Sequence, residues 1–258
     1  MWVRAELKAR ARLVLGHNYW DGVGTSVVTG LIAGIPVMMV SYLFVIFDII
    51  LLSATYYGGA EVGDTAVLIT SHSELLMTTL LILVVIVELG LIMAAIILFT
   101  LPLTAGLMHY FNRAAGLRGS FGDIFYAFRE GRYVKVTGAM AWRLLFTWLW
   151  TLLFYVPGIV KGIAYSMVPF ILSDNPGIGA RRALRLSVEM TQGHKWRIFV
   201  LMLSFLGWIL LSMCTFNIGL LFLYPYLYAT YAELYATLRA QALQKGITSV
   251  EELCLLSR

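Results

Sequence analysis

The sequence predicts an all-α membrane protein, a polytopic transmembrane helical bundle of about six spans with amphipathic interfacial helices on the cytoplasmic side. The first observation is composition: 60% of the 258 residues are hydrophobic and 13% are charged, whereas soluble domains have about 45–50% apolar and about 25% charged residues. The second is that several apolar runs approach the roughly 20 residues that a membrane-spanning helix needs. The third is that basic residues gather between these runs. This pattern excludes a soluble enzyme, a disordered protein and a nucleic-acid-binding module.

We interpret residues 1–258 as a single integral membrane domain. Its parts are a cytoplasmic amphipathic segment, 1–22, a transmembrane bundle, 23–238, and a cytoplasmic tail, 239–258. The first apolar run exceeds the 7–15-residue core of a cleavable signal peptide, which predicts an uncleaved anchor.

Spans are expected at 23–47, 75–101, 136–156, 159–172, 198–213 and 220–238. A loop over 53–74 should join the first two. Pro102 should bend or end the second span, because proline removes a helical hydrogen bond. The pair Pro157-Gly158 should stop the third span. The fourth is short and is compatible with a tilted span, a re-entrant arm or the second half of a broken helix.

The orientation follows from lysine and arginine, since cytoplasmic loops hold the excess of these residues. Four segments contain 17 of the 19, and they alternate along the chain with loops 53–74 and 214–219, which contain none. Both termini are therefore expected inside. The acidic loop with Glu61, Asp64 and Glu74 is expected outside.

Two basic segments have helical spacing. Arg4, Lys8 and Arg12 form a like-charged stripe that would repel itself in water, so we expect a helix in the membrane plane whose charges meet anionic phospholipid. The Asn175-Pro176 pair predicts the start of a second such helix. Its candidate headgroup contacts are Arg181, Arg182 and Arg185. The alternative is that all six residues are ordinary topology determinants.

A third polar segment lies between the second and third spans. There, Ser120-Phe-Gly-Asp123 has the form of a capping box ahead of Ile124, Phe125 and Phe128, which predicts the start of a short helix.

Ionisable residues inside spans are candidate functional residues, because a charge in the bilayer is costly. Glu88 is the deepest, and either a protonated hydrogen-bonded carboxyl or a proton or cation site would explain it. Arg143 and Lys161 are expected close enough to the ends of their spans to snorkel.

Small residues at a spacing of four indicate close helix packing. Gly30 and Gly34 continue such a stripe from Ser26, and Gly158 and Gly162 repeat it. Internal packing and dimerisation both remain open. The segment from Pro157 to Gly162 is alternatively an unwound break of the kind that transporters place at a substrate site.

The chain carries no enzyme motif. Its four histidines are spread over separate segments, without H-E-x-x-H, a nucleophile elbow, a phosphate-binding glycine loop or metal-type Cys/His spacing. We therefore predict no catalysis, no cofactor and no metal.

A set of motifs resembles a family of bacterial integral membrane proteins known as domain of unknown function nine-seven-five, most clearly from Leu144 to Leu238. The motifs are Arg4-Ala-Glu-Leu-Lys8, Gly16-His-Asn-Tyr-Trp20, Val156-Pro-Gly-Ile-Val-Lys161, Tyr165, Ile171-Leu-Ser-Asp-Asn-Pro176, Gly193-His-Lys-Trp196, Ser204-Phe-Leu-Gly-Trp208, Gly219 and Pro225-Tyr226. The variable loop over 53–74 falls outside the resemblance. The resemblance implies a multi-pass protein of the bacterial cytoplasmic membrane, and it implies no activity.

Two functions remain after this reading. The first is an accessory or scaffold protein that binds anionic lipid and a membrane-protein partner or a second copy of itself. The alternative is a small transporter or proton- or ion-coupled permease that uses Glu88 and a broken helix at Pro157.

Overall fold

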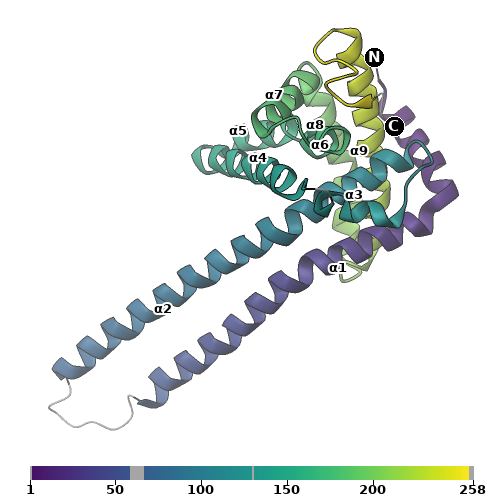
Figure 1. The fold of residues 1–258 in the computed structure, drawn as a ribbon. Coiled ribbons are helices and arrows are strands. Elements are labelled where there is room, and N and C mark those ends of the chain that lie inside the picture. Colours follow the sequence, from purple (N-terminus) through teal and green to yellow (C-terminus); the bar gives the residue numbers. More distant parts are fainter. Residues whose placement is uncertain (1, 59–66, 130, 256–258) are drawn as a thin grey trace. The chain divides into compact units, whose positions relative to one another are not determined.

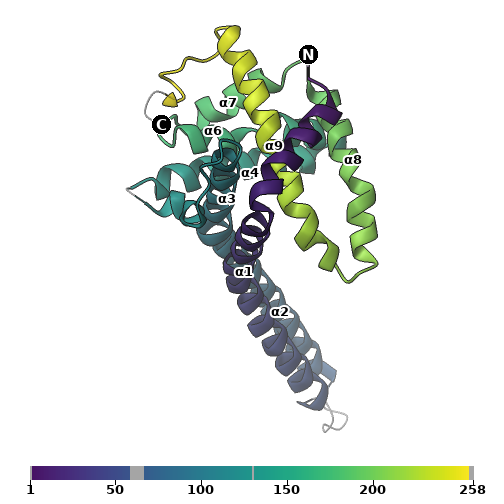
Figure 2. The same cartoon turned by 90° about the vertical axis from the view of Figure 1, so that its right-hand side faces the viewer.

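The computed structural model describes residues 2–58, 67–129 and 131–255, and all regular structure in these ranges is helical. Figures 1 and 2 show the arrangement in two views at right angles. The elements are α1 (Arg4–Gly58), α2 (Val67–Ala95), the π-helix η1 (Ile96–Thr100), α3 (Leu101–Ala114), the 3₁₀-helix η2 (Phe121–Phe128), α4 (Tyr133–Leu153), α5 (Tyr155–Ala164), α6 (Val168–Asp174), α7 (Ala180–Thr191), α8 (Lys195–Met213) and α9 (Ile218–Gln244).

Five helical segments in the described ranges are long and apolar enough to cross a membrane. They are Tyr19–Ser53, Leu75–Ala114, Tyr133–Leu153, Tyr155–Asp174 and Lys195–Met213. The all-α polytopic class is therefore confirmed. The expected sixth span is indeed a helix, α9, but tyrosines and Glu233 interrupt its apolar sequence, and it is not among the five.

The chain divides into two compact units. Unit 1 contains Met1–Gly30 and Leu101–Arg258, and unit 2 contains Leu31–Thr100. In unit 2 the second part of α1 and the helix α2 run beside each other in opposite directions (Figures 1 and 2). Most apolar side chains along both are exposed, which is the pattern expected of helices surrounded by lipid.

The expected boundaries near the N-terminus were wrong. A single continuous helix, α1, replaces the separate interfacial segment and first span, and helix also occupies much of the expected 53–74 loop. The residues after 47 are mostly apolar and contain no glycine or proline before Gly58, so nothing in the sequence stops the helix. Glu61 and Asp64 lie outside the described residues.

Pro102 does not end the second span. The chain instead passes through the π-helix Ile96–Thr100 and continues as α3 to Ala114. Because proline has no N–H, the carbonyl four residues earlier loses its normal donor, and a local π-turn accommodates that change. The segment around His109, expected as a polar loop, is therefore the buried end of a helix.

The core of unit 1 lies around α3 and α6. Nearly all of α3 and every residue of α6 are buried, and α3 contacts η2, α4, α6 and α9. The approach of η2 is very close, because a Cβ at Gly106 would overlap the backbone of Ile124. Only glycine fits at this position.

The fourth expected span is itself divided into two short helices, a break within 159–172 that the sequence did not predict. Its halves are α5 and α6, separated by a turn at Tyr165–Met167. The break from α4 lies at Phe154, whose backbone is extended. Pro157 and the residues to Gly162 are helical, so the expected unwound segment at this place was wrong.

Candidate functional site

Four polar side chains meet where α3 packs on α6. His109 Nδ1 lies 2.9 Å from Ser173 Oγ, and Asn112 Nδ2 donates to Ser173 Oγ at 3.1 Å and to Asp174 Oδ1 at 2.8 Å. All four residues are buried. Buried polar groups are stable only when they are hydrogen-bonded, so this network fixes how the two helices face each other.

Helix α9 completes the network from the other side. Tyr235 donates its hydroxyl to Asp174 Oδ2 at 2.6 Å, and Arg239 Nη1 donates to the same oxygen at 2.8 Å. The Asp174 side chain is 0% exposed, so its negative charge needs the arginine as a partner. Asp174 therefore joins α3, α6 and α9.

Beside this network lies a polar cavity of about 850 Å³, named here the arginine-lined cavity. Four arginines reach it from α3, η2 and the segments around them. Its lining is His109, Asn112, Arg113, Gly116, Arg118, Asp123, Tyr126, Arg129, Arg132, Ser173, Asp174, Pro176 and Cys254. Ligand sites are typically about 300–1,000 Å³, so the cavity is large enough for a small anion or a headgroup.

The wall contributed by η2 is held by the predicted capping motif. Asp123 Oδ2 accepts from the Ser120 backbone N–H at 2.9 Å, while its Oδ1 accepts from Arg113 Nη1 at 3.0 Å. Tyr126 stacks on His109 with ring centroids 3.8 Å apart and donates to the Leu172 carbonyl. These contacts place the 3₁₀-helix firmly against α3 and α6.

The described lining of the cavity carries an excess of positive charge. Its two carboxylates already have cationic partners, since Asp123 pairs with Arg113 and Asp174 with Arg239. Arg118 and Arg129 are exposed and take part in no ion pair among the described residues; Arg129 Nη2 donates to the Gly122 carbonyl at 3.1 Å. Guanidinium groups bind phosphate and carboxylate strongly, so the cavity favours an anion.

Apolar side chains are exposed directly beside these arginines. On η2 they are Phe121, Phe125 and Phe128; the turn after α3 adds Leu117, and the start of α4 adds Val134. Exposed aromatic side chains next to cationic ones are typical of a surface at the membrane–water interface.

Comparison with known proteins identifies one family over this region. Residues 124–242 match the family model described as protein of unknown function (DUF975). The resemblance drawn from the sequence is confirmed over these residues. Searches of curated proteins and of solved structures found no match.

The DUF975 match covers part of the site. It contains Arg129, Ser173, Asp174, Tyr235 and Arg239. The residues on α3 and the loop after it, His109, Asn112, Arg113 and Arg118, precede it. The polar network therefore joins the matched region to the chain that comes before it.

Part of the first basic stripe contacts protein, while Arg4 and Arg12 are exposed, so its contact with anionic phospholipid stays a prediction. Its helix buries Leu7 and Ala11. Lys8 Nζ lies 4.4 Å from the Phe205 ring centroid, and Arg12 lies over Tyr226 at 5.7 Å. Burial lowers the pKa of the Lys8 ammonium, and the neighbouring charges of Arg12 and Arg4 lower it further.

The second basic segment begins later than expected, and its headgroup contacts at Arg181 and Arg185 stay a prediction. Helix α7 begins at Ala180, after Gly179 with a φ of 77°, whereas Asn175 ends α6 and accepts from the Gly177 N–H. Arg181 and Arg185 are exposed, and Arg185 pairs with Glu189 at 2.9 Å.

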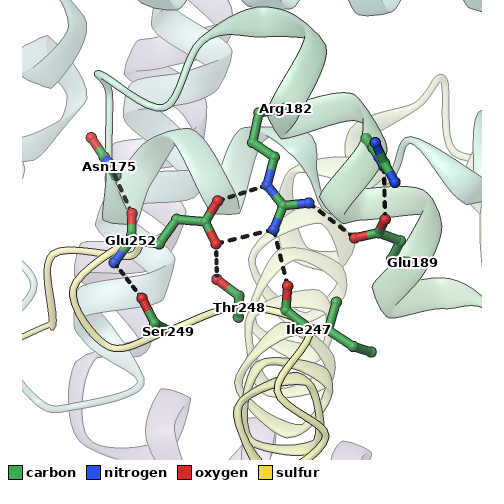
Figure 3. Close-up of polar contacts among 8 residues, drawn as sticks. Asn175, Arg182, Glu189, Ile247, Thr248, Ser249 and Glu252 are labelled. Atoms are coloured by element: carbon green, nitrogen blue, oxygen red, sulfur yellow. Dashed lines mark hydrogen bonds and ion pairs between the residues drawn. The ribbon is translucent and has the colours of Figure 1, made fainter.

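Arg182 is committed to the C-terminal segment (Figure 3). Its Nε donates to Glu252 Oε1 at 2.6 Å, its Nη1 to Glu189 Oε2 at 3.0 Å and its Nη2 to the Ile247 carbonyl at 3.0 Å. A guanidinium with these partners is not available to a headgroup, so the expected lipid contact at Arg182 was wrong. Residues 245–255 form a docked segment rather than a free tail.

The intramembrane candidates lie in different places. Glu88 is on α2 in unit 2, partly exposed, and has no hydrogen-bond or ion-pair partner among the described residues. Lys161 lies over the Trp150 ring at 4.9 Å. Arg143 lies in the middle of α4, not near the end of a span.

The two glycine stripes differ. Gly158 packs closely on Thr151, and a Cβ at Gly162 would meet Thr147 Cγ2 at 3.8 Å, so this stripe allows α5 to approach α4. A Cβ at Gly30 or Gly34 would meet no atom within 4 Å. The described residues therefore show no close packing at those two positions, and dimerisation through them stays a prediction.

Sequence reasoning missed the polar network. A histidine and an asparagine three residues apart share a helix face, so His109 and Asn112 gave a signal once α3 is known to be a helix. Ser173-Asp174 at the end of an apolar run was a second signal. Nothing in the sequence alone indicated that the two pairs meet.

Proposed function

We propose that this protein is a non-catalytic accessory protein of the membrane that binds the headgroup of an anionic phospholipid in the arginine-lined cavity. The proposal rests on one observation. Arg118 and Arg129, which form no ion pair among the described residues, line the cavity, and exposed phenylalanines lie on the adjacent helix η2. A headgroup phosphate would meet the guanidinium groups, while the phenylalanines would insert among the acyl chains beside it.

The expected orientation supports the same assignment. The cavity arginines belong to a basic segment that the distribution of charge predicts to lie on the cytoplasmic side. Anionic phospholipid gives that leaflet its negative surface potential. On this proposal both the cavity and its ligand belong to the same membrane face.

The test is native mass spectrometry of the purified chain with phosphatidylglycerol and phosphatidylcholine. The double variant Arg118→Gln/Arg129→Gln should lose affinity for phosphatidylglycerol by roughly thirtyfold, because each juxtamembrane basic residue contributes about 1 kcal/mol. Binding of zwitterionic phosphatidylcholine should not change.

The matched control removes two exposed arginines elsewhere. Arg181→Gln/Arg185→Gln deletes the same charge from α7, away from the cavity lining. Phosphatidylglycerol binding should remain near that of the wild type. Equal losses in the two double variants would assign the effect to general surface charge and would reject the cavity as the site.

A further inference from the structure

A second cavity, of about 380 Å³ and named here the Arg143 cavity, lies within unit 1 and shares no lining residue with the arginine-lined cavity. Side chains from α3, α4, α5, α6, α8 and α9 converge on it. Its lining is Thr104, Met108, Arg143, Gly162, Ile163, Ser166, Pro169, Phe170, Met202, Phe205, Ile209, Leu227, Tyr228 and Tyr231.

The position of Arg143 is costly in a membrane helix. Ten residues separate it from each end of α4, Tyr133–Leu153, so at 1.5 Å per residue it is about 15 Å from either end. An arginine at such a depth costs about 2.5 kcal/mol or more. A charge kept at this cost usually has a partner or a function.

The Arg143 guanidinium has no polar partner in the part of the chain that the structure describes. Among residues 2–58, 67–129 and 131–255, no carboxylate, hydroxyl or carbonyl forms a hydrogen bond or ion pair with its guanidinium. It is also the one described lining residue of this cavity with a formal charge. The cavity thus presents unpaired positive charge without an acid to neutralise it.

The rest of the lining defines what kind of anion would fit. Most of it is aliphatic or aromatic, and the broken-helix turn contributes Ser166, while α9 contributes the hydroxyl-bearing Tyr228 and Tyr231. A free inorganic anion would leave the apolar wall uncovered. An anionic headgroup with one acyl chain would meet both the arginine and the apolar wall.

We propose that the Arg143 cavity binds a single-chain anionic amphiphile, with the headgroup on the Arg143 guanidinium and the chain along the apolar wall. A carboxylate and a phosphate share this chemistry, since both accept paired hydrogen bonds from guanidinium. The ligand is therefore a fatty-acid-like or lysophospholipid-like molecule. This inference does not depend on the phospholipid site proposed above.

The experiment uses the full chain, delipidated in a neutral detergent, with three probes that share an oleoyl chain. Oleate presents a carboxylate, oleoyl lysophosphatidic acid presents a phosphate, and monoolein is uncharged. Native mass spectrometry should show one bound anion per protein chain. The affinity for monoolein should be at least about tenfold lower than that for the anions, because uncharged monoolein cannot form a charge-assisted hydrogen bond with Arg143. The tighter of the two anions then distinguishes carboxylate from phosphate.

Substitutions locate the site. Arg143→Gln should weaken anion binding by about tenfold or more and leave monoolein unchanged, while Arg143→Lys should retain part of the affinity. Ile209→Trp should also weaken binding, by filling the cavity without removing charge. The Arg118→Gln/Arg129→Gln variant should bind oleate as the wild type does, which separates this site from the arginine-lined cavity.

Three results would overturn the inference. They are equal oleate affinity in the wild type and Arg143→Gln, equal affinity of the wild type for oleate and monoolein, and the absence of any anion bound to the wild type. Melting curves of each variant, followed by circular dichroism, establish that the helical fold is retained in each comparison.

Discussion

At the residue scale, Asp174 is the centre of the molecule's polar core. Its side chain has no exposed surface, and Asn112, Tyr235 and Arg239 all donate to that side chain. Removing one member of a buried ion pair costs about 3–5 kcal/mol, because the remaining charge is left without compensation. The network should therefore be the least tolerant set of polar residues in unit 1.

Arg239→Met tests this statement. It should lower the free energy of unfolding by about 3–5 kcal/mol, since the buried Asp174 carboxylate loses its cation. Unfolding in mixed SDS and neutral-detergent micelles, followed by circular dichroism, measures the change. Arg185→Met is the control: its pair with Glu189 is exposed on the arginine side and should contribute less than about 1 kcal/mol. Equal losses in the two variants would contradict a central role for Asp174.

The sequence predicted some components of the site, but it did not predict how they are arranged. The capping motif at Ser120 and Asp123 was predicted from its spacing, and the structure contains the Asp123 contact. The excess of basic residues around Arg118 and Arg129 was visible as well. That these arginines face a cavity next to Ser173 depends on packing over more than 40 residues of chain, which a local pattern does not record.

At the element scale, the docked C-terminal segment explains why Arg182 on the basic face of α7 was misassigned. Helical spacing shows which residues share a face but not what covers it. Here Glu252, Thr248 and the Ile247 carbonyl surround Arg182 (Figure 3). The covering acid lies 70 residues further along the chain.

The docked segment should be sensitive to acid. The hydrogen bond from Arg182 lowers the pKa of Glu252 below its ordinary value of 4.5. The stabilisation is therefore fully present above pH 4.5, and it is lost as the pH falls through the lower pKa of the docked state. Hydrogen-exchange protection factors for residues 245–255 should decrease over that acidic range and remain constant between pH 6 and 8.

A substitution at neutral pH should reproduce the acidic change. Glu252→Gln should lower protection of 245–255 by about 1 kcal/mol, a modest value because both side chains of the pair are partly exposed. Glu251→Gln, at an exposed neighbouring position, should have no effect. Equal exchange in the two variants would show that the ion pair does not hold the segment.

Element boundaries were the least predictable part of the fold. Pro102 was expected to bend or end a helix; the helix continues past it, and a π-turn before it accommodates the missing hydrogen bond. Asn175-Pro176 was expected to begin one, but Gly179 takes that place. In both cases the helix changes within a few residues of the predicted position.

At the scale of the whole molecule, composition and apolar run length were sufficient for the all-helical membrane class. Both quantities average over many residues, so a wrong interpretation of a single residue does not change the predicted class. The number of spans was harder to predict than the class. Six were expected, whereas α9 is not among the five apolar segments of the described ranges, because its composition is rich in tyrosine and only moderately apolar. The inside location of both termini stays a prediction.

The transport alternative gains no support from the described structure. Glu88 has no polar partner there and lines neither of the two cavities discussed above. The segment from Pro157 to Gly162 is helical rather than unwound. Both cavities are lined by arginine, which is the feature on which the two proposed lipid-binding sites rest.

The most direct test of the phospholipid site is a measurement of contact between guanidinium nitrogen and lipid phosphorus. Solid-state NMR of ¹⁵N-arginine-labelled protein in phosphatidylglycerol bilayers reports it as dephasing of the guanidinium signals by ³¹P. We expect clear dephasing in the wild type, a large loss of it in Arg118→Gln/Arg129→Gln, and little loss in Arg181→Gln/Arg185→Gln. Dephasing that survives unchanged in the cavity variant would contradict a headgroup in the arginine-lined cavity.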